Sequence, residues 1–411
     1  MNIFSKIIDI DNIREAYFEV VQKFEEQNRS YSYSGIDGKR LADYDFDSEN
    51  LFLTIKKELE VFQTINPSLE IMIPKKNKPG LRPVYIHTLK ERIKSQAVFR
   101  IVYPYFDEYF THYVYSYRPS HPYETAIKTV VRRYKNTAHQ ESILIGDIGS
   151  YSDNINPQIL KKQIQRIGFD ADTNKILYLY VDMQMFQEGE IRSSERGILT
   201  GLPITVLFNN LYLNSFDKIF GKELSLYRRV GDDFIAFDNK ENLQKAKKEM
   251  HVLLDELLVP QKDQKIEIIK KNNCFKFLGY EFNNGIISIL PKSVRNIKIY
   301  LRSRLRYRPF HSCDKKIKNF KKLFFEKEAL KYYFVQIVRQ YNHCNDREQI
   351  KHLADYFLIR ATIYFFGTYT KRNRRLTQKI LRDLDIPSLT QYYRAFHSGS
   401  MSPEKLHTLT T

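Results

Sequence analysis

Apolar residues along the chain recur with two different periods, and the period changes from segment to segment. Spacings of three and four residues predict helices over 1–65, 89–110, 156–169, 203–220 and 241–258, with a turn near Gly35-Ile36-Asp37-Gly38. Compact apolar or alternating runs predict strands at 69–74, 81–86, 142–145, 224–237 and 274–290. Everything after Lys292 has the helical pattern.

This order of elements predicts a fold class. Strands mixed with helices up to about residue 290 indicate an α+β fold, and the remainder indicates an all-α region. A chain of 411 residues is long enough for two or three packed subdomains. No apolar run approaches the roughly 20 residues that span a bilayer, so no membrane partner is expected. The first residues have the pattern of an ordinary helix rather than of a signal peptide.

Charge is distributed unevenly along the chain. Residues 286–411 hold 26 Lys and Arg against nine Asp and Glu, and so carry +17 of the net +18. The same region is rich in Tyr and Phe, a combination that suits a phosphate backbone with bases stacked nearby. A solvated basic surface over an aromatic helical core is the alternative. The scattered Cys274, Cys313 and Cys344 indicate neither a zinc site nor a disulfide framework, and a reduced, cytoplasmic protein is expected.

Two acidic segments are candidates for chemistry. Asp232-Asp233 lies between two apolar runs, where a tight hairpin turn would bring both carboxylates into one volume. Such a pair repels unless a cation neutralises it, and hard oxygen ligands suit Mg²⁺. Asp147 ends another apolar strand and could supply a third carboxylate to a two-metal site. Asp153-Asn154 is expected to cap the next helix.

Seven motifs in order give the chain a specific resemblance over about residues 30–285. They are Gly35–Gly38; Ile73–Pro83 with Lys90–Ile93; Ser116-Tyr117-Arg118-Pro119-Ser120; Asp147–Ile155; Gly197–Leu213; Asp232-Asp233; and Phe277-Leu278-Gly279-Tyr280. With this order and spacing the chain resembles the reverse transcriptases of bacterial group II introns and their relatives. The resemblance implies a right-hand polymerase, with fingers and a palm that contains an antiparallel sheet, followed by a basic helical thumb. The expected divisions are 1–65, an N-terminal helical extension; 66–285, fingers and palm; and 286–411, the thumb.

The resemblance also assigns roles to residues. Asp147, Asp232 and Asp233 would be catalytic and would hold two Mg²⁺ ions, with Mn²⁺ as an alternative. Ile148 is implied as a fourth residue of the metal site. The residues implied at the nucleoside triphosphate are Lys75, Lys76, Arg82, Tyr151, Ser152 and Lys265, with Lys262 as the alternative to Lys265. Those implied at the template and primer are Arg118, Thr200, Gly201, Phe277, Leu278, Gly279 and Tyr280. A guanidinium fork can clamp phosphate oxygens and a lysine adds a point charge, so the basic residues suit this role.

The chain departs from the family pattern at several positions. Ser152 stands where an aromatic residue normally blocks the ribose 2′-hydroxyl, which predicts weaker discrimination against ribonucleotides unless Tyr151 takes that role. Thr200, Thr205-Val206 and Val230 replace the usual Gln, Ser-Pro and Tyr. No His/Cys endonuclease segment follows the palm. These features favour a stand-alone, defence-associated enzyme of the abortive-infection or unknown-group type, acting against phage.

The implied partners are a cognate non-coding RNA template, nucleoside triphosphates and nascent DNA, with a homo-oligomer or partner protein in addition. Three other interpretations stay open. The protein could be a diversity-generating or retron-type reverse transcriptase, or an RNA-binding subunit that keeps the polymerase fold without the chemistry. Gly231-Asp232-Asp233 also occurs in RNA-dependent RNA polymerases.

Overall fold

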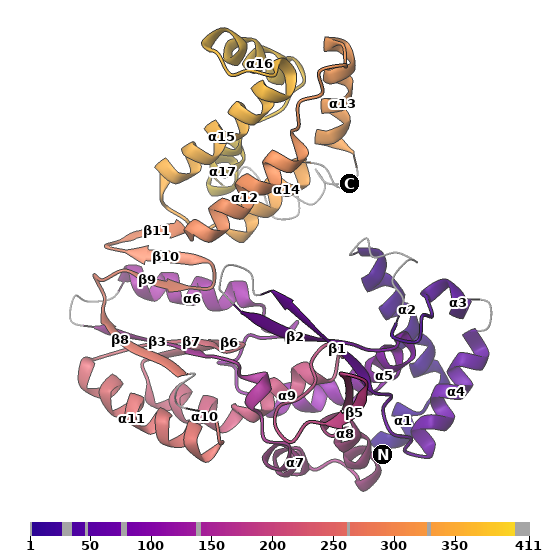
Figure 1. The fold of residues 1–411 in the computed structure, drawn as a ribbon. Coiled ribbons are helices and arrows are strands. Elements are labelled where there is room, and N and C mark those ends of the chain that lie inside the picture. Colours follow the sequence, from indigo (N-terminus) through magenta and orange to yellow (C-terminus); the bar gives the residue numbers. More distant parts are fainter. Residues whose placement is uncertain are drawn as a thin grey trace. The chain divides into compact units, whose positions relative to one another are not determined.

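The computed structural model describes residues 2–26, 35–45, 48–74, 80–136, 141–260, 264–326 and 330–398. They form two compact units (Figure 1). The first unit comprises Met1–Ala126 and Glu141–Ile268, and the second comprises Ile127–Gln140 and Ile269–Thr411. Each unit has its own core and is described by itself.

The predicted N-terminal helices are present in the first unit. They are α1 (Ile3–Ile7), α2 (Ile10–Glu26), α3 (Leu41–Asp45) and α4 (Ser48–Glu60), which pack around the long α5 (Leu89–Tyr109). The Thr88 side chain begins α5 by accepting a hydrogen bond from the Glu91 amide. Apolar faces of α2, α4 and α5 meet in one core, which includes Val20, Ile55 and Ile93.

A four-stranded sheet with the order β2-β1-β4-β5 lies beside these helices. Its strands are β1 (Ser68–Pro74), β2 (Leu81–Ile86), β4 (Gln184–Gln187) and β5 (Glu190–Ser193). The antiparallel β1–β2 pair confirms the strands predicted there. The β4–β5 hairpin was not predicted, because its residues are polar and mostly exposed.

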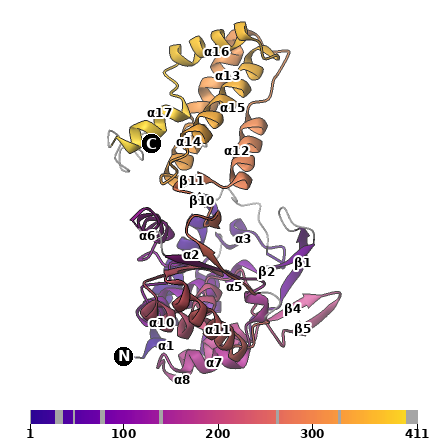
Figure 2. The ribbon, with the colours of Figure 1, turned by 90° about the vertical axis from the view of Figure 1, so that its left-hand side faces the viewer.

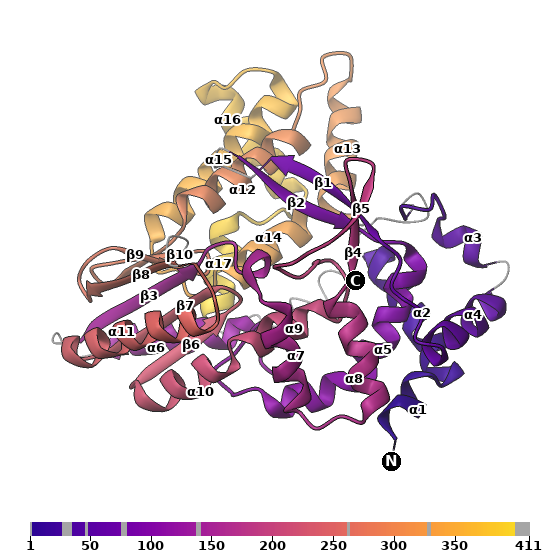
Figure 3. The same cartoon turned by 60° about the horizontal axis from the view of Figure 1, so that its bottom comes forward.

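A second sheet, with the order β6-β7-β3-β8, carries the acidic segments. Its strands are β3 (Ser142–Ile148), β6 (Leu226–Val230), β7 (Asp233–Asp238) and β8 (Gln264–Lys270). The pairs β3–β7 and β6–β7 are antiparallel. Helices α10 (Asn214–Glu223) and α11 (Lys240–Glu256) cover one face of this sheet (Figure 3). The predicted strands at β3, β6 and β7 are confirmed.

The remaining helices of the first unit connect the two sheets. They are α7 (Pro157–Gln165), α8 (Ala171–Val181) and α9 (Thr205–Tyr212). The apolar segment predicted as one helix over 203–220 is two, α9 and α10, divided at Leu213. The expected cap at Asp153-Asn154 is wrong: these residues lie in a short 3₁₀ turn, and the Asn156 side chain caps α7.

The second unit is mainly helical (Figure 2). It contains α6 (Tyr123–Asn136) for most of its length, a small sheet and a helical bundle. The sheet, with the order β11-β10-β9, consists of β9 (Phe275–Phe277), β10 (Tyr280–Asn283) and β11 (Ile286–Ile289). The bundle consists of α12 (Pro291–Arg304), α13 (Cys313–Phe325), α14 (Leu330–Gln340), α15 (Arg347–Phe366), α16 (Lys371–Asp383) and α17 (Leu389–His397). The helical character predicted after residue 292 is confirmed for the described residues up to 398. None of the described helices is long and apolar enough to cross a membrane.

Candidate active site

The Asp232-Asp233 pair stands at a two-residue hairpin turn between β6 and β7. Val230 pairs with Asp233, which leaves only Gly231 and Asp232 in the loop. Gly231 has φ +68°, a conformation in which glycine is favoured because it lacks a Cβ. A first loop residue with positive φ is typical of the tight turns that match strand twist. The turn therefore projects both acidic residues from one end of the sheet.

The strand register brings Asp147 to the same place. Asp147 is the direct cross-strand partner of Asp233 in the β3–β7 pair. The next amide, that of Ile148, donates to the Asp232 carbonyl over 3.2 Å. One position earlier, Gly146 faces Phe234, whose ring would lie 2.0 Å from a Cβ added at Gly146. The glycine therefore allows the strands to pack closely where the carboxylates converge.

The three carboxylates influence one another electrostatically. Burial and the charges of Asp232 and Asp147 raise the pKa of Asp233 to about 7. Burial and the Asp147 charge also raise the pKa of Asp232, against the lowering effects of a backbone hydrogen bond and of Arg229. Crowded acids of this kind resist full ionisation, and a bound cation would relieve the repulsion.

The donor set fits a hard divalent ion in its chemistry, although it is incomplete. Within the described part of the chain, no group of three or more His, Cys, Asp or Glu side chains is arranged as a ready metal site. Mg²⁺ usually takes one or two protein carboxylates and fills its other positions with water and substrate phosphates. Asp147, Asp232 and Asp233 could therefore contribute part of such a coordination shell.

Tyr151 and Ser152 differ in where their side chains lie. Tyr151 is buried, and its hydroxyl donates to the Asn209 carbonyl over 2.9 Å. Ser152 is partly exposed and donates to the Asn209 side chain over 3.1 Å. The Tyr151 side chain therefore lies in the core, and this position gives no support for the steric role that the sequence left open for it.

The segment with Thr200 and Gly201 lies beside the end of β2, next to His87. His87 is within 3.0 Å of the Thr200 carbonyl, and Gly201 has φ +109°. Upstream, the Gly197 amide donates to the Ile155 carbonyl over 2.7 Å. These bonds attach the expected template-contacting turn to the β2 end and to the segment after Asp147.

Of the basic residues expected at the nucleotide, the structure describes Arg82 and Lys265. Arg82 is an exposed residue of β2, and Lys265 is an exposed residue of β8. Lys75, Lys76 and the alternative Lys262 lie outside the described residues. The roles of these residues at a nucleoside triphosphate stay predictions.

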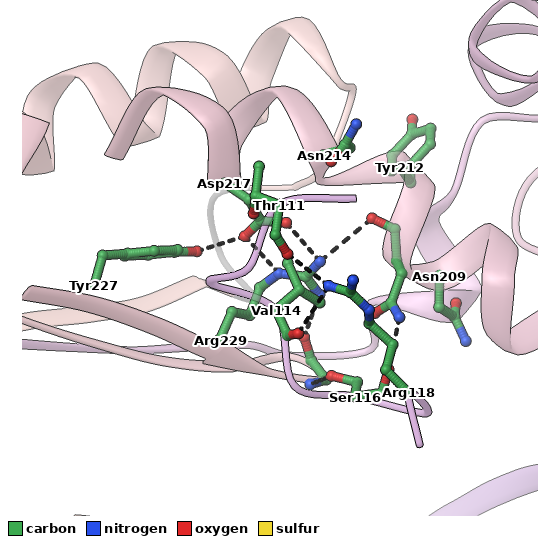
Figure 4. A network of polar contacts seen from close by, with 12 residues as sticks. Thr111, Val114, Ser116, Arg118, Asn209, Tyr212, Asn214, Asp217, Tyr227 and Arg229 are labelled. Atoms are coloured by element: carbon green, nitrogen blue, oxygen red, sulfur yellow. Dashed lines mark hydrogen bonds and ion pairs between the residues drawn. The ribbon is translucent and has the colours of Figure 1, made fainter. Parts of the chain in front are cut away.

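Three expected template or primer contacts are buried. The first is Arg118, whose Nη1 donates to the carbonyls of Thr111 and Val114 (Figure 4). Its Nε and Nη2 donate to the side chain and the carbonyl of Asp107. A direct template contact from Arg118 is therefore not supported.

The other two are Phe277 and Tyr280, which are 4% and 2% exposed and belong to the core of the second unit. Only Leu278 and Gly279, which form the turn between β9 and β10, are partly exposed, and both have positive φ. Of these four motif residues, only Leu278 and Gly279 are exposed enough to contact a primer.

Two residues near the carboxylates were missed from the sequence. Tyr117 is 58% exposed, and partial burial together with the Asp232 charge raises its pKa. Arg229 is completely buried and ion-paired with Asp217. Strand alternation gives a signal for Arg229, because it shares a face with the buried Tyr227.

A sheet that carries three acidic residues at one hairpin end, together with the helices and the second four-stranded sheet of the first unit, is compatible with the α+β polymerase fold. The family model described as "Reverse transcriptase (RNA-dependent DNA polymerase)" matches residues 73–282, about half of the chain. The protein belongs to the reverse transcriptase family. Members of this family generally use divalent metal ions and bind RNA templates and nucleotides.

Two curated relatives support this assignment. Protein YkfC of Escherichia coli K12 is 29% identical over 154 residues, which are 37% of this chain and 40% of that protein. The group II intron-encoded protein LtrA of Lactococcus lactis is 23% identical over 226 residues, 54% of this chain and 37% of LtrA. The chain thus matches about two fifths of the length of each relative.

Proposed function

We propose that the protein is an RNA-directed DNA polymerase whose carboxylates bind two Mg²⁺ ions. The observation that carries the proposal is the register that sets Asp147 opposite Asp233, one residue from Asp232, within the segment that matches the family. Bound Mg²⁺ would supply charge neutralisation at phosphate oxygens and activation of the attacking hydroxyl. The protein's own contribution is to place Asp147 and Asp233 at paired strand positions, next to Asp232.

A synthesis assay tests this proposal. Purified protein, with its co-purified nucleic acid left in place, is supplied with Mg²⁺ and each nucleotide in turn. We expect incorporation of deoxynucleotides that is sensitive to ribonuclease and is lost in Asp232→Ala/Asp233→Ala. Asp182→Ala, which removes an exposed carboxylate paired with Lys161, should keep wild-type activity. Equal activity in the double variant would reject the carboxylate site.

The assay also separates the other interpretations. RNA that remains bound without any metal-dependent incorporation would favour the binding subunit. Incorporation of ribonucleotides alone would favour an RNA polymerase.

We further propose a dedicated template and a role in antiphage defence. The departures at Ser152, Thr200 and Val230 support specialised rather than general copying. Sequencing the bound RNA and the DNA product should yield one recurring non-coding RNA and its complement. Plaque counts on cells carrying the wild-type gene should fall relative to cells carrying the Asp232→Ala/Asp233→Ala gene. A product copied from a repeat adjacent to a variable gene would instead indicate a diversity-generating enzyme. A cytoplasmic location and association with a further subunit belong to the same proposal.

A further inference from the structure

Gly231, which begins the carboxylate turn, is held by side chains at both of its backbone polar groups. Its amide donates to the Ser116 hydroxyl, and its carbonyl accepts from the Arg229 guanidinium over 2.8 Å. Because the loop contains only two residues, restraining the backbone of Gly231 also restrains the direction in which the chain enters Asp232. Asp232 and Asp233 also place like charges side by side, and these repel when no cation is bound.

Arg229 is itself anchored from the opposite side. Its Nε and Nη2 donate to the two carboxylate oxygens of Asp217, on α10, over 2.8 and 2.7 Å. Both side chains are 0% exposed. The Tyr227 hydroxyl adds a third bond to Asp217, over 2.8 Å. The turn is therefore connected through one guanidinium to a helix that packs on the sheet.

Asn210, on α9, closes the network into a ring. Its side-chain amide donates to the Ser116 carbonyl over 2.8 Å, and its own carbonyl accepts from Arg229 Nη2 over 3.3 Å. Ser116, Gly231, Arg229 and Asn210 are thus linked in a closed cycle. Three segments distant in sequence meet in this cycle, at 116, 210 and 229–231.

A fully buried ion pair often adds little to the stability of a fold, since apolar residues of similar volume often stabilise it as well or better. The guanidinium has a different advantage, because its rigid fork serves the Asp217, Asn210 and Gly231 acceptors at once. A lysine has one nitrogen and cannot reproduce that geometry. The arrangement therefore suits a positioning role better than a purely stabilising one.

We propose that Ser116, Asn210 and Arg229 are positioning residues that hold the Gly231-Asp232 turn in the conformation that binds the divalent ion. This inference rests on the proposed function, because it assumes that the carboxylates bind a divalent ion. Its test measures metal binding and hydrogen exchange and needs no polymerase assay. Supporting side chains of this kind commonly change metal affinity by about 10-fold or more when they are removed.

The test compares Ser116→Ala and Arg229→Lys with Tyr227→Phe in the full chain. Tyr227→Phe removes a buried hydrogen bond from the same network without touching the turn, and is the matched control. Mn²⁺ affinity is measured by electron paramagnetic resonance, and hydrogen exchange is measured in peptides that cover the turn. We expect Ser116→Ala to weaken Mn²⁺ binding about 10-fold and to speed exchange at the turn, with little change in melting temperature. Arg229→Lys should do the same if it folds, and Tyr227→Phe should do neither.

Wild-type Mn²⁺ affinity and exchange in Ser116→Ala would overturn the inference. So would equal effects of Ser116→Ala and Tyr227→Phe, which would indicate general loosening of the core. Failure of the proposed function would be distinct from both: metal binding would still depend on Ser116, but wild-type protein would incorporate no nucleotide.

Discussion

At the scale of single residues, Ser152 shows how a substitution can be weighed once its neighbours are known. The sequence left open whether the aromatic Tyr151 replaces the missing bulk at Ser152. Tyr151 is buried, and its hydroxyl is bonded to the Asn209 carbonyl. The small Ser152 side chain, bonded to the Asn209 side chain, is therefore the group that stands at the position of the usual aromatic residue. The discrimination between sugars should therefore depend on the size of residue 152.

We predict that the wild-type protein accepts ribonucleotides and that Ser152→Phe excludes them. The added ring would occupy space that a 2′-hydroxyl otherwise enters. The measurement is the ratio of kcat/KM for a deoxynucleotide to that for the matching ribonucleotide. Tyr151→Phe, which loses one hydroxyl in the core, is the control and should leave the ratio unchanged. A strict deoxynucleotide preference in the wild type would contradict the prediction.

His87 makes a second residue-scale prediction, on stability against pH. It is 1% exposed, and burial lowers its pKa to about 4, more than its bond to the Thr200 carbonyl raises it. An unfolded histidine titrates near 6.5, so between about pH 6.5 and 4 the unfolded chain binds a proton that the folded chain does not. Folding stability should therefore fall as the pH is lowered through this window, by up to about 3 kcal/mol.

Denaturant unfolding of the wild type and of His87→Gln at several pH values checks the prediction. The glutamine amide can still donate to the Thr200 carbonyl, and it does not titrate. The variant should lose less stability than the wild type between pH 6.5 and 4. Parallel pH profiles for the two proteins would show that His87 is not responsible.

At the scale of secondary structure, the β3–β7 pair depends on a close fit between Gly146 and Phe234. A Cβ at residue 146 would lie within 2.0–2.6 Å of three ring atoms of Phe234, and both strands are buried there. Gly146→Ala should destabilise the protein by about 1–3 kcal/mol, because the ring has to move in a packed core. The same shift would disturb Asp147, the next residue.

A double-mutant cycle checks this fit by denaturant unfolding. Phe234→Leu removes the ring edge, so Gly146→Ala should cost less in the Phe234→Leu background than in the wild type. Additive effects of the two substitutions would mean that the strands move apart at little cost and that the glycine is not required by the ring.

The elements that sequence analysis predicted are those with a strong apolar pattern. β3, β6 and β7 are largely buried, whereas β1 and β2 are compact apolar runs that are only partly buried. Helices such as α5 and α7 have clear starts at Thr88 and Asn156. The β4–β5 hairpin has no such pattern, because it is held by backbone pairing to β1 and not by a buried face. Leu213 divides an evenly apolar segment, where periodicity alone gives no boundary.

The part of the candidate site that sequence analysis predicted is also the part with a recognisable pattern. Acidic residues at strand ends can be recognised in a sequence, and the register then brings Asp147 and Asp233 together. Buried polar networks are harder to recognise, because the acceptors of Arg118 and Arg229 follow only from the fold. Strand alternation indicates that Arg229 shares a face with the buried Tyr227, but it does not reveal the partners of the guanidinium. Arg118 was accordingly assigned to the template, and Arg229 was overlooked.

At the scale of the whole molecule, the positive charge is concentrated in the second unit. Residues 286–411 carry +17 of the net +18. Helix α16 contributes an exposed cluster of Arg372, Arg375 and Lys379, none of which forms an ion pair within the described residues. Uncompensated surface charge of one sign favours binding to a polyanion and makes the binding sensitive to salt.

We predict that α16 contacts the nucleic-acid backbone, so that Arg372→Ala/Arg375→Ala/Lys379→Ala weakens RNA binding and flattens its dependence on salt. Each phosphate contact contributes about 0.7 to the slope of log affinity against log salt for a single strand, so losing three should reduce the slope by about 2. The control is Lys240→Ala/Lys245→Ala/Lys248→Ala, which removes the same charge from exposed positions of α11 in the first unit. Fluorescence anisotropy with a labelled RNA at several salt concentrations gives both slopes. Equal reductions in the two triple variants would show that net charge alone matters, whereas a reduction confined to the α16 variant would place RNA contacts on that helix.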